Sequence, residues 1–309
     1  MKPRLLKIAR LPAMLDDALN ATYDVVDADQ NGTGVGESTA DIRAMVANGE
    51  STVSRQLIDS LPELEVIVVF GVGYDGVDVT AARERGIRVT HTPDVLTEDV
   101  ADFAMALMLG IARNLRVADR FTRSGAWANG PIAFSRKVSR ARLGIIGLGR
   151  IGAAIARRAQ GFDMSIAYTG RRPQDVGFTY YPSALELAAA VDFLVVAVGG
   201  GASTHHLVDA KVLEALGPKG YLINVGRGSV VDETALARVL AEGRLAGAAL
   251  DVYEDEPHPI AALLNLDNTL LTPHMASATW DTRQAMSDLV MANLHAWHSG
   301  ADLPTPVPE

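Results

Sequence analysis

Arg227, Glu256 and His274 are polar residues that follow three successive predicted strands in the second half of the chain. The strands are expected at 221–225, 246–252 and 269–272. Open α/β sheets bind ligands at the carboxyl ends of their strands, so a guanidinium, a carboxylate and an imidazole are expected to converge on one site. Each group also has a structural alternative: a helix-capping arginine, a solvated acidic turn and a histidine packed in a turn.

Together these three groups match the needs of hydride transfer to a 2-keto acid. The planar fork of Arg227 can bind the carboxylate and carbonyl oxygens of such a substrate together. His274 suits proton donation to the carbonyl oxygen, because an imidazole titrates near neutral pH. Glu256, hydrogen-bonded to the other ring nitrogen, would fix the tautomer of His274 and favour its charged form.

A glycine motif precedes these residues in the chain and predicts a dinucleotide site. Gly147, Gly149 and Gly152 have the G-x-G-x-x-G spacing, between an apolar segment at 143–146 and a helical pattern at 151–159. The first glycine permits a tight turn, the second lets the backbone approach a pyrophosphate, and the third lets the helix pack on the strand. The N-terminus of the helix would then face the phosphates.

The end of the next strand indicates which dinucleotide binds. The segment Thr169-Gly170-Arg171-Arg172 stands where an NAD-selective site has a carboxylate, and no acid lies between Asp163 and Asp175. Guanidinium groups bind a 2′-phosphate through charge-assisted hydrogen bonds. NADP is therefore predicted, with NADPH preferred over NADH; the alternative is a solvated basic turn.

Composition limits the remaining possibilities. The chain has 309 residues, a net charge of −9 and no cysteine. Two domains are expected from this length, and the acidic charge argues against a nucleic acid or an anionic membrane as partner. The lack of cysteine excludes disulfides and thiolate metal sites. No apolar stretch resembles a signal peptide or a membrane span, so a cytoplasmic location is the default expectation.

Strand and helix patterns alternate along both halves of the chain, as expected for an α/β fold with parallel sheets. In the first half, strands are predicted at 5–9, 23–28, 42–47, 66–70 and 88–91, with helices near 12–19, 54–60 and 80–85. The second half has further strands at 143–146, 164–168 and 193–198, and helices near 184–190, 208–215, 233–242 and 280–298. The helix at 97–113 is apolar nearly all round, which predicts either a central position or burial against another subunit.

The motifs as a group resemble a known enzyme family. They are Gly147–Gly152, Asn224–Gly228, Ala248–Pro257 and Leu271–His274. They are similar to the signatures of the D-isomer-specific 2-hydroxyacid dehydrogenases, and the similarity spans essentially the whole chain. The stretches 168–172, 180–183 and 216–220 resemble the NADPH-preferring glyoxylate and hydroxypyruvate reductases of that family.

The resemblance implies the architecture and the site. It implies two Rossmann-like, doubly wound parallel-sheet domains with the active site in the interdomain cleft: 1–96 plus 283–309 for substrate, and 97–282 for the dinucleotide. Arg227, Glu256 and His274 are the implied catalytic set, and backbone N–H groups of Val72 and Gly73 bind the substrate carboxylate together with Arg227 and His274. The implied cofactor residues are Gly147, Leu148, Gly149, Arg150, Ile151, Gly152, Thr169, Gly170, Arg171, Arg172, Val198, Thr204, Val225, Arg227, Asp251, His274 and Ser277. A homodimer through the cofactor domain is also implied.

Several alternatives stay open at this point. The chain could act on another D-2-hydroxy acid or on phosphite, or it could serve as a dinucleotide-sensing corepressor, as some relatives in the family do. Segments 199–204 and 275–277 depart from the usual family pattern. The other six histidines show no acid or cysteine partner at ligand spacing, so no metal is predicted. Trp127 and Trp280 could line the substrate pocket, or they could pack at an interface or in a core.

Overall fold

The computed structural model describes residues 2–33 and 40–308. Contacts between residues divide the chain into two compact units, Met1–Leu96 with Ser277–Glu309 and Thr97–Ala276. The chain returns to the first unit just before α11 (Trp280–Ser299), which packs as one body against β4 (Val66–Phe70) and α1 (Ala13–Thr22) of that unit. The sequence-based boundary at 282/283 lies inside this helix. A helix that packs along one sheet stays with that sheet over its full length, so the contact boundary precedes it.

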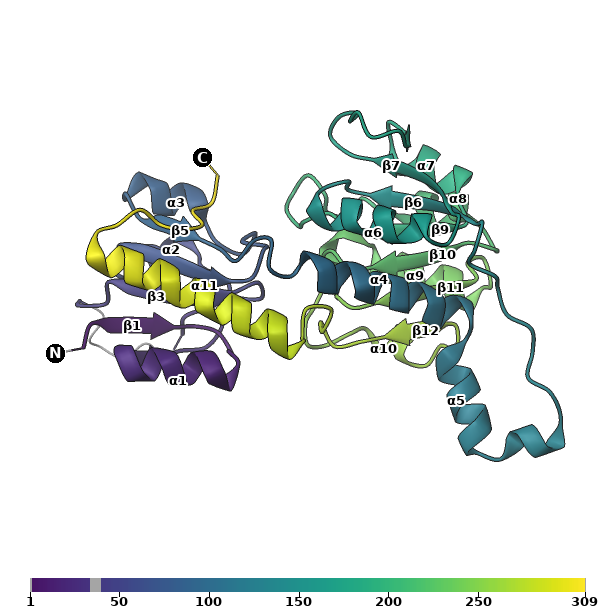
Figure 1. The fold of residues 1–309 in the computed structure, drawn as a ribbon, viewed down its shortest axis with the longest axis horizontal. Coiled ribbons are helices and arrows are strands. Elements are labelled where there is room, and N and C mark those ends of the chain that lie inside the picture. Colours follow the sequence, from purple (N-terminus) through teal and green to yellow (C-terminus); the bar gives the residue numbers. More distant parts are fainter. Residues whose placement is uncertain (1, 34–39, 309) are drawn as a thin grey trace. The chain divides into compact units, whose positions relative to one another are not determined.

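The first unit is built on a five-stranded parallel sheet with strand order β2-β1-β3-β4-β5 (Figure 1). Its interior strand β4 is buried at every residue, as expected for a parallel strand covered on both faces. The remaining elements are β1 (Arg4–Lys7), β2 (Asp24–Asp27), β3 (Ala44–Asn48), α2 (Arg55–Asp59), α3 (Val79–Glu84) and β5 (Arg88–Thr90). The fold predicted for this half is therefore confirmed.

The second unit is built on a seven-stranded parallel sheet with strand order β12-β11-β10-β9-β6-β7-β8 (Figure 1). Its strands are β6 (Arg142–Ile146), β7 (Ser165–Thr169), β8 (Thr179–Tyr180), β9 (Phe193–Val196), β10 (Tyr221–Asn224), β11 (Gly247–Leu250) and β12 (Thr269–Leu271). The strand order reverses between β6 and β9. Ligands of such sheets bind at the carboxyl ends beside this reversal, where the glycine motif begins.

The helices of the second unit are α4 (Thr97–Ala112), α5 (Leu115–Arg123), α6 (Arg150–Gln160), α7 (Ala184–Ala190), α8 (Ala210–Leu216), α9 (Glu233–Ala241) and α10 (Ala261–Leu264). All of them except α5 have buried residues in this unit. Helix α4 lies against α6 and against β10, β11 and β12 (Figure 1). Its apolar surface is thus explained by burial inside its own unit, which decides between the two expectations for this helix. Among the described residues, no helix is both long and apolar enough to cross a bilayer.

Candidate functional site

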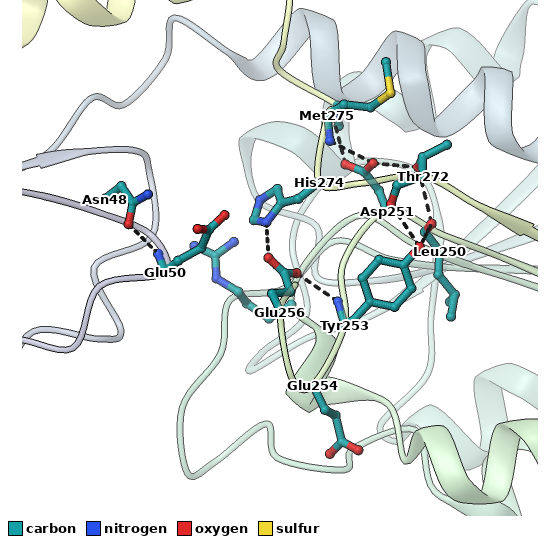
Figure 2. Close-up of polar contacts among 12 residues, drawn as sticks. Asn48, Glu50, Leu250, Asp251, Tyr253, Glu254, Glu256, Thr272, His274 and Met275 are labelled. Atoms are coloured by element: carbon teal, nitrogen blue, oxygen red, sulfur yellow. Dashed lines mark hydrogen bonds and ion pairs between the residues drawn. The ribbon is translucent and has the colours of Figure 1, made fainter. Parts of the chain in front are cut away.

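His274 is paired with Glu256 in the second unit. The ring Nδ1 of His274 lies 2.6 Å from Oε2 of Glu256, and Oε1 of Glu256 accepts a hydrogen bond of 2.9 Å from the Tyr253 N–H (Figure 2). The carboxylate is thus held by the turn that carries it and by the imidazole. With Nδ1 engaged, Nε2 is the ring nitrogen through which His274 can exchange a proton with a substrate.

The loop that carries His274 is fixed by the carboxylate of Asp251, which is 1% exposed. It accepts hydrogen bonds from the Thr272 hydroxyl (2.6 Å) and from the N–H groups of Met275 (2.9 Å) and Ala276 (2.8 Å). The N–H of His274 donates to the Asp251 carbonyl at 2.8 Å, and His274 has a φ of 50°. A non-glycine residue seldom adopts this left-handed conformation, so the surrounding hydrogen bonds must hold it there.

The turn that carries Glu256 is anchored from two sides. Burial raises the pKa of Tyr253 to about 12, so its hydroxyl stays neutral and donates to the Thr272 carbonyl at 2.9 Å. The Glu254 N–H donates at 2.8 Å to Glu233, whose carboxyl is buried at the start of α9. The turn after β11 is thereby tied both to the segment after β12 and to a neighbouring helix.

Arg227 lies in the segment that follows β10, and buried Asn224 shapes this segment. The amide of Asn224 donates to the Arg227 carbonyl (3.0 Å), and its side-chain oxygen accepts from the Gly226 N–H (3.1 Å). A Cβ on Gly228 would lie 1.8 Å from the backbone of Tyr253, so only glycine lets these two segments touch. The structure therefore brings the three predicted catalytic residues together at three consecutive strand ends.

Opposing effects act on the pKa of His274. Burial, the largest, lowers it, but the hydrogen bond and the charge of Glu256 raise it. The charge of Arg227 lowers it and that of Asp251 raises it. The net result is a pKa above the ordinary value for histidine, so His274 keeps its proton to a higher pH than an unperturbed imidazole.

The glycine motif has the geometry that its spacing predicts. Gly147 has a φ of 93°, and a Cβ on Gly152 would lie 2.1 Å from the Gly147 carbonyl oxygen. Gly149 is the N-cap residue of α6, provides no side-chain cap, and has open space where a Cβ would stand. The turn therefore leaves room at the N-terminus of an 11-residue helix, where phosphate oxygens are favoured. Leu148, Arg150 and Ile151 belong to this turn and to the first turn of α6.

Other predicted cofactor residues lie along the same edge. The Gly147 N–H donates to the Thr169 carbonyl at 3.0 Å, which joins the glycine turn to the end of β7. Val225 donates to Val196 at the end of β9, and a Cβ on Gly226 would come within 2.5 Å of the Val198 carbonyl oxygen. The Thr204 hydroxyl donates to the Gly199 carbonyl. Ser277 is half-buried and begins the segment that returns to the first unit.

Arg171 and Arg172 follow Gly170 directly after β7, and both are exposed. Within residues 2–33 and 40–308, no acid forms an ion pair with either arginine. Two guanidinium groups without carboxylate partners are suited to bind a phosphate group.

Val72 and Gly73 lie in the first unit, in the turn after β4. The neighbouring Gly71 exchanges hydrogen bonds with Thr92, and the Val72 carbonyl accepts one of 2.9 Å from Nδ1 of His91. These contacts fix the turn through groups other than the N–H groups of Val72 and Gly73. In the described part of the chain, no acceptor binds those two N–H groups.

The remaining histidines have no acid partner at ligand spacing in the sequence, but the fold places one beside His206. Its Nε2 is hydrogen-bonded to Glu254, which lies far away in the sequence and next to it only in the fold. The rings of His205 and His206 stack with centroids 4.0 Å apart and planes 26° apart. One ligand atom from each of His205, His206 and Glu254 lies within 4.8 Å of the others.

Comparison with known proteins identifies the family. Residues 105–276 match the model described as D-isomer specific 2-hydroxyacid dehydrogenase, NAD binding domain. The chain belongs to this family. It is therefore an oxidoreductase that binds a nicotinamide dinucleotide in its second unit.

Similar proteins cover most of the chain. A glyoxylate/hydroxypyruvate reductase of Arabidopsis thaliana is 51% identical over 86% of this chain and 85% of its own, and a hydroxyphenylpyruvate reductase of Plectranthus scutellarioides is 49% identical over the same shares. Among solved structures, an NADPH-dependent glyoxylate/hydroxypyruvate reductase of Sinorhizobium meliloti, in complex with NADP and malonate, is similar with a TM-score of 0.94. It is 47% identical, and the match covers 99% of this chain and 97% of that one.

We predict that Glu256→Gln lowers the pKa of His274. The substitution removes the charge that raises this pKa and leaves the burial that lowers it. An NMR titration of the imidazole protons checks this, with the His274 resonance assigned from its loss in His274→Asn. Glu254→Gln is the control, because that carboxylate contacts His206 instead. If the His274 titration does not change in Glu256→Gln, the pairing does not set its proton affinity.

Proposed function

We propose that the chain is an NADPH-dependent reductase of small 2-keto acids, which converts glyoxylate to glycolate and hydroxypyruvate to D-glycerate. The observation that carries the proposal is the His274–Glu256 pair beside Arg227 at the strand ends of a dinucleotide-binding sheet. Reductases of these two substrates, 51% identical in Arabidopsis and 47% identical in Sinorhizobium, support it.

The residues present fit a bound dinucleotide. The open space at Gly149 and the N-terminus of α6 suit the pyrophosphate, and the exposed arginines after β7 suit a 2′-phosphate. A bound nicotinamide supplies a hydride from its C4 atom to the carbonyl carbon of the substrate. Val198, Val225 and Asp251 belong to the three strand ends beside the glycine turn and are the proposed neighbours of the nicotinamide half.

The side chains of the protein then bind the substrate, polarise its carbonyl group and donate the proton that the reduced oxygen needs. Arg227 binds the carboxylate and polarises the carbonyl, which lowers the energy of the alkoxide that develops. His274 donates its Nε2 proton to that oxygen, so the product is the neutral hydroxyl group. Glu256 stabilises the imidazolium before transfer and orients the ring. The N–H groups of Val72 and Gly73 are the proposed backbone donors to the substrate carboxylate.

Larger 2-keto acids are the second candidate substrates. The hydroxyphenylpyruvate reductase that is 49% identical and a 2-ketogluconate reductase of Gluconobacter oxydans that is 43% identical both act, by name, on bulkier molecules. All these substrates share the keto acid group that Arg227 and His274 would engage. Comparing kcat/KM for glyoxylate, hydroxypyruvate, hydroxyphenylpyruvate and 2-ketogluconate decides among them.

We further propose a homodimer formed through the second unit. Helix α5 buries none of its residues within the chain, and the segment after it exposes large apolar side chains: Trp127 is 68% exposed and Phe134 fully so. Apolar residues gathered on a projecting segment are typical of a surface that another subunit covers. The exposed segment 115–135, rather than α4, is the proposed interface (Figure 1).

His274→Ala is expected to reduce kcat for keto acid reduction by about 10²- to 10⁴-fold, the usual contribution of a general acid. NADPH binding, followed by cofactor fluorescence, should be retained. His295→Ala, an exposed histidine on α11, is the control and should keep full activity. A kcat that is unchanged in His274→Ala removes this residue from the mechanism.

Arg171→Ala with Arg172→Ala is expected to raise the KM for NADPH by roughly tenfold or more, since hydrogen bonds to a charged group contribute about 1.5–3 kcal/mol. The KM for NADH should change little, because NADH has no 2′-phosphate. Arg238→Ala, an exposed arginine on α9, controls for the loss of positive charge. Equal effects on both cofactors would contradict the proposed role.

Sedimentation is expected to show a dimer for the wild type and a monomer for Trp127→Glu with Phe134→Glu, because charge is costly in an apolar interface. Trp280→Glu is the matched control: this tryptophan is 83% exposed but belongs to the first unit. A wild-type monomer, or a double variant that remains dimeric, would contradict an interface at this segment.

A further inference from the structure

Gln174 connects the loop after β7 to the glycine turn. Its side-chain Nε2 donates a hydrogen bond of 3.0 Å to the carbonyl of Leu148, the residue between Gly147 and Gly149. Its backbone N–H donates to the hydroxyl of Tyr168 at 2.6 Å, and that hydroxyl lies 3.2 Å from the Gln174 carbonyl, to which it donates. The ring of Tyr168 is fully buried, so the contact point is rigid.

The two ends of this loop are also attached to the sheet. At its start, the Gly170 carbonyl accepts a hydrogen bond from the hydroxyl of Tyr180, which belongs to β8. Beyond its end, β8 pairs with β7, and the Tyr181 N–H that follows β8 donates to the carbonyl of Tyr168 in β7. Gln174 therefore pins the middle of a loop whose ends are already fixed. The half of the loop between the end of β7 and Gln174 contains Arg171 and Arg172.

We propose that Gln174 is a positioning residue for cofactor selectivity. Through its bond to Leu148 it sets the place of the Arg171–Arg172 segment relative to the glycine turn. The arginine segment that would bind the 2′-phosphate of NADP and the glycine turn that would bind the pyrophosphate are then held at a fixed distance from each other. This inference rests on the proposed preference for NADPH. Gln174 would contribute to that preference without contacting any phosphate group of the cofactor.

The effect of this tether should be confined to NADPH. Without it, the two arginines must be ordered when the cofactor binds, and the conformational entropy lost in doing so weakens binding. NADH makes no use of the arginines and escapes this cost. The residues proposed for proton transfer and substrate binding follow β10, β11 and β12, or β4 in the first unit, and none of them belongs to the loop after β7, so kcat should not depend on the tether.

Gln174→Met tests the inference, because methionine keeps the length of the side chain and removes the N–H donor. The expected result is a rise of about three- to tenfold in the KM for NADPH, the range of one hydrogen bond, with kcat and the KM for NADH unchanged. Tyr168→Phe removes the second contact and should shift the same parameter. Gln160→Met, at the exposed end of α6, is the matched control and should leave both KM values unchanged.

Combination with the arginine variant separates positioning from general stability. In a chain that already carries Arg171→Ala and Arg172→Ala, Gln174→Met should have no further effect on the KM for NADPH. Two outcomes would overturn the role of Gln174 and leave the proposed preference for NADPH standing. Gln174→Met could still raise the KM for NADPH in the chain that lacks both arginines, or the preference for NADPH could be unchanged by Gln174→Met in the wild-type chain. A wild-type enzyme that uses NADH as well as NADPH overturns the proposed cofactor preference, and the role of Gln174 falls with it.

Discussion

The buried carboxylate of Asp251 is the constraint on which the geometry of the site depends. It accepts hydrogen bonds from one hydroxyl and two backbone N–H groups of segment 272–276. A buried carboxylate is costly unless donors of this kind surround it, and here these donors also bend the chain into the left-handed conformation at His274. The same interaction therefore pays for the buried charge and aims the imidazole.

The register of the sheet explains how one residue can organise its neighbours. Asn224 is paired with Leu250, and Leu250 with Leu271, so β10, β11 and β12 end side by side. Asn224 and Asp251 are both buried and both direct their side chains to the backbone just beyond these ends. Each loop is thus shaped by a polar group that the rigid sheet fixes. Asn224 and Asp251 therefore oppose small displacements of the loops that follow β10, β11 and β12.

The sequence predicts those features that depend on local pattern. Strand β4 occupies the predicted range, because a short apolar run that is mostly valine and isoleucine favours a strand buried on both faces. The two-sheet fold is confirmed, and the three strand-end residues lie together because the order of motifs follows the order of strands. Helix α5 and strand β8 were not predicted: α5 has no buried face within the chain, and β8 has only two residues.

Contacts that depend on tertiary structure could not be predicted. The bond of His206 to Glu254 joins residues from separate loops, and the bond of Gln174 to Leu148 joins two loops of the cofactor site. Neither has a signal in residue spacing. A search for polar side chains placed within a few residues of a recognised motif could have selected Gln174 as a candidate, but not its partner. Helix α4 is a further example. Its apolar sequence predicts that it is buried, but not which elements bury it.

Under the proposed function, the balance of charges around His274 would link substrate binding to proton transfer. Arg227 and burial lower the pKa of His274, whereas Glu256 and Asp251 raise it. Under the proposed function, a substrate carboxylate bound to Arg227 would offset the guanidinium charge and so remove one of the two effects that lower the pKa of His274. His274 would then hold its proton most firmly with a keto acid bound, and would release it as negative charge develops on the carbonyl oxygen.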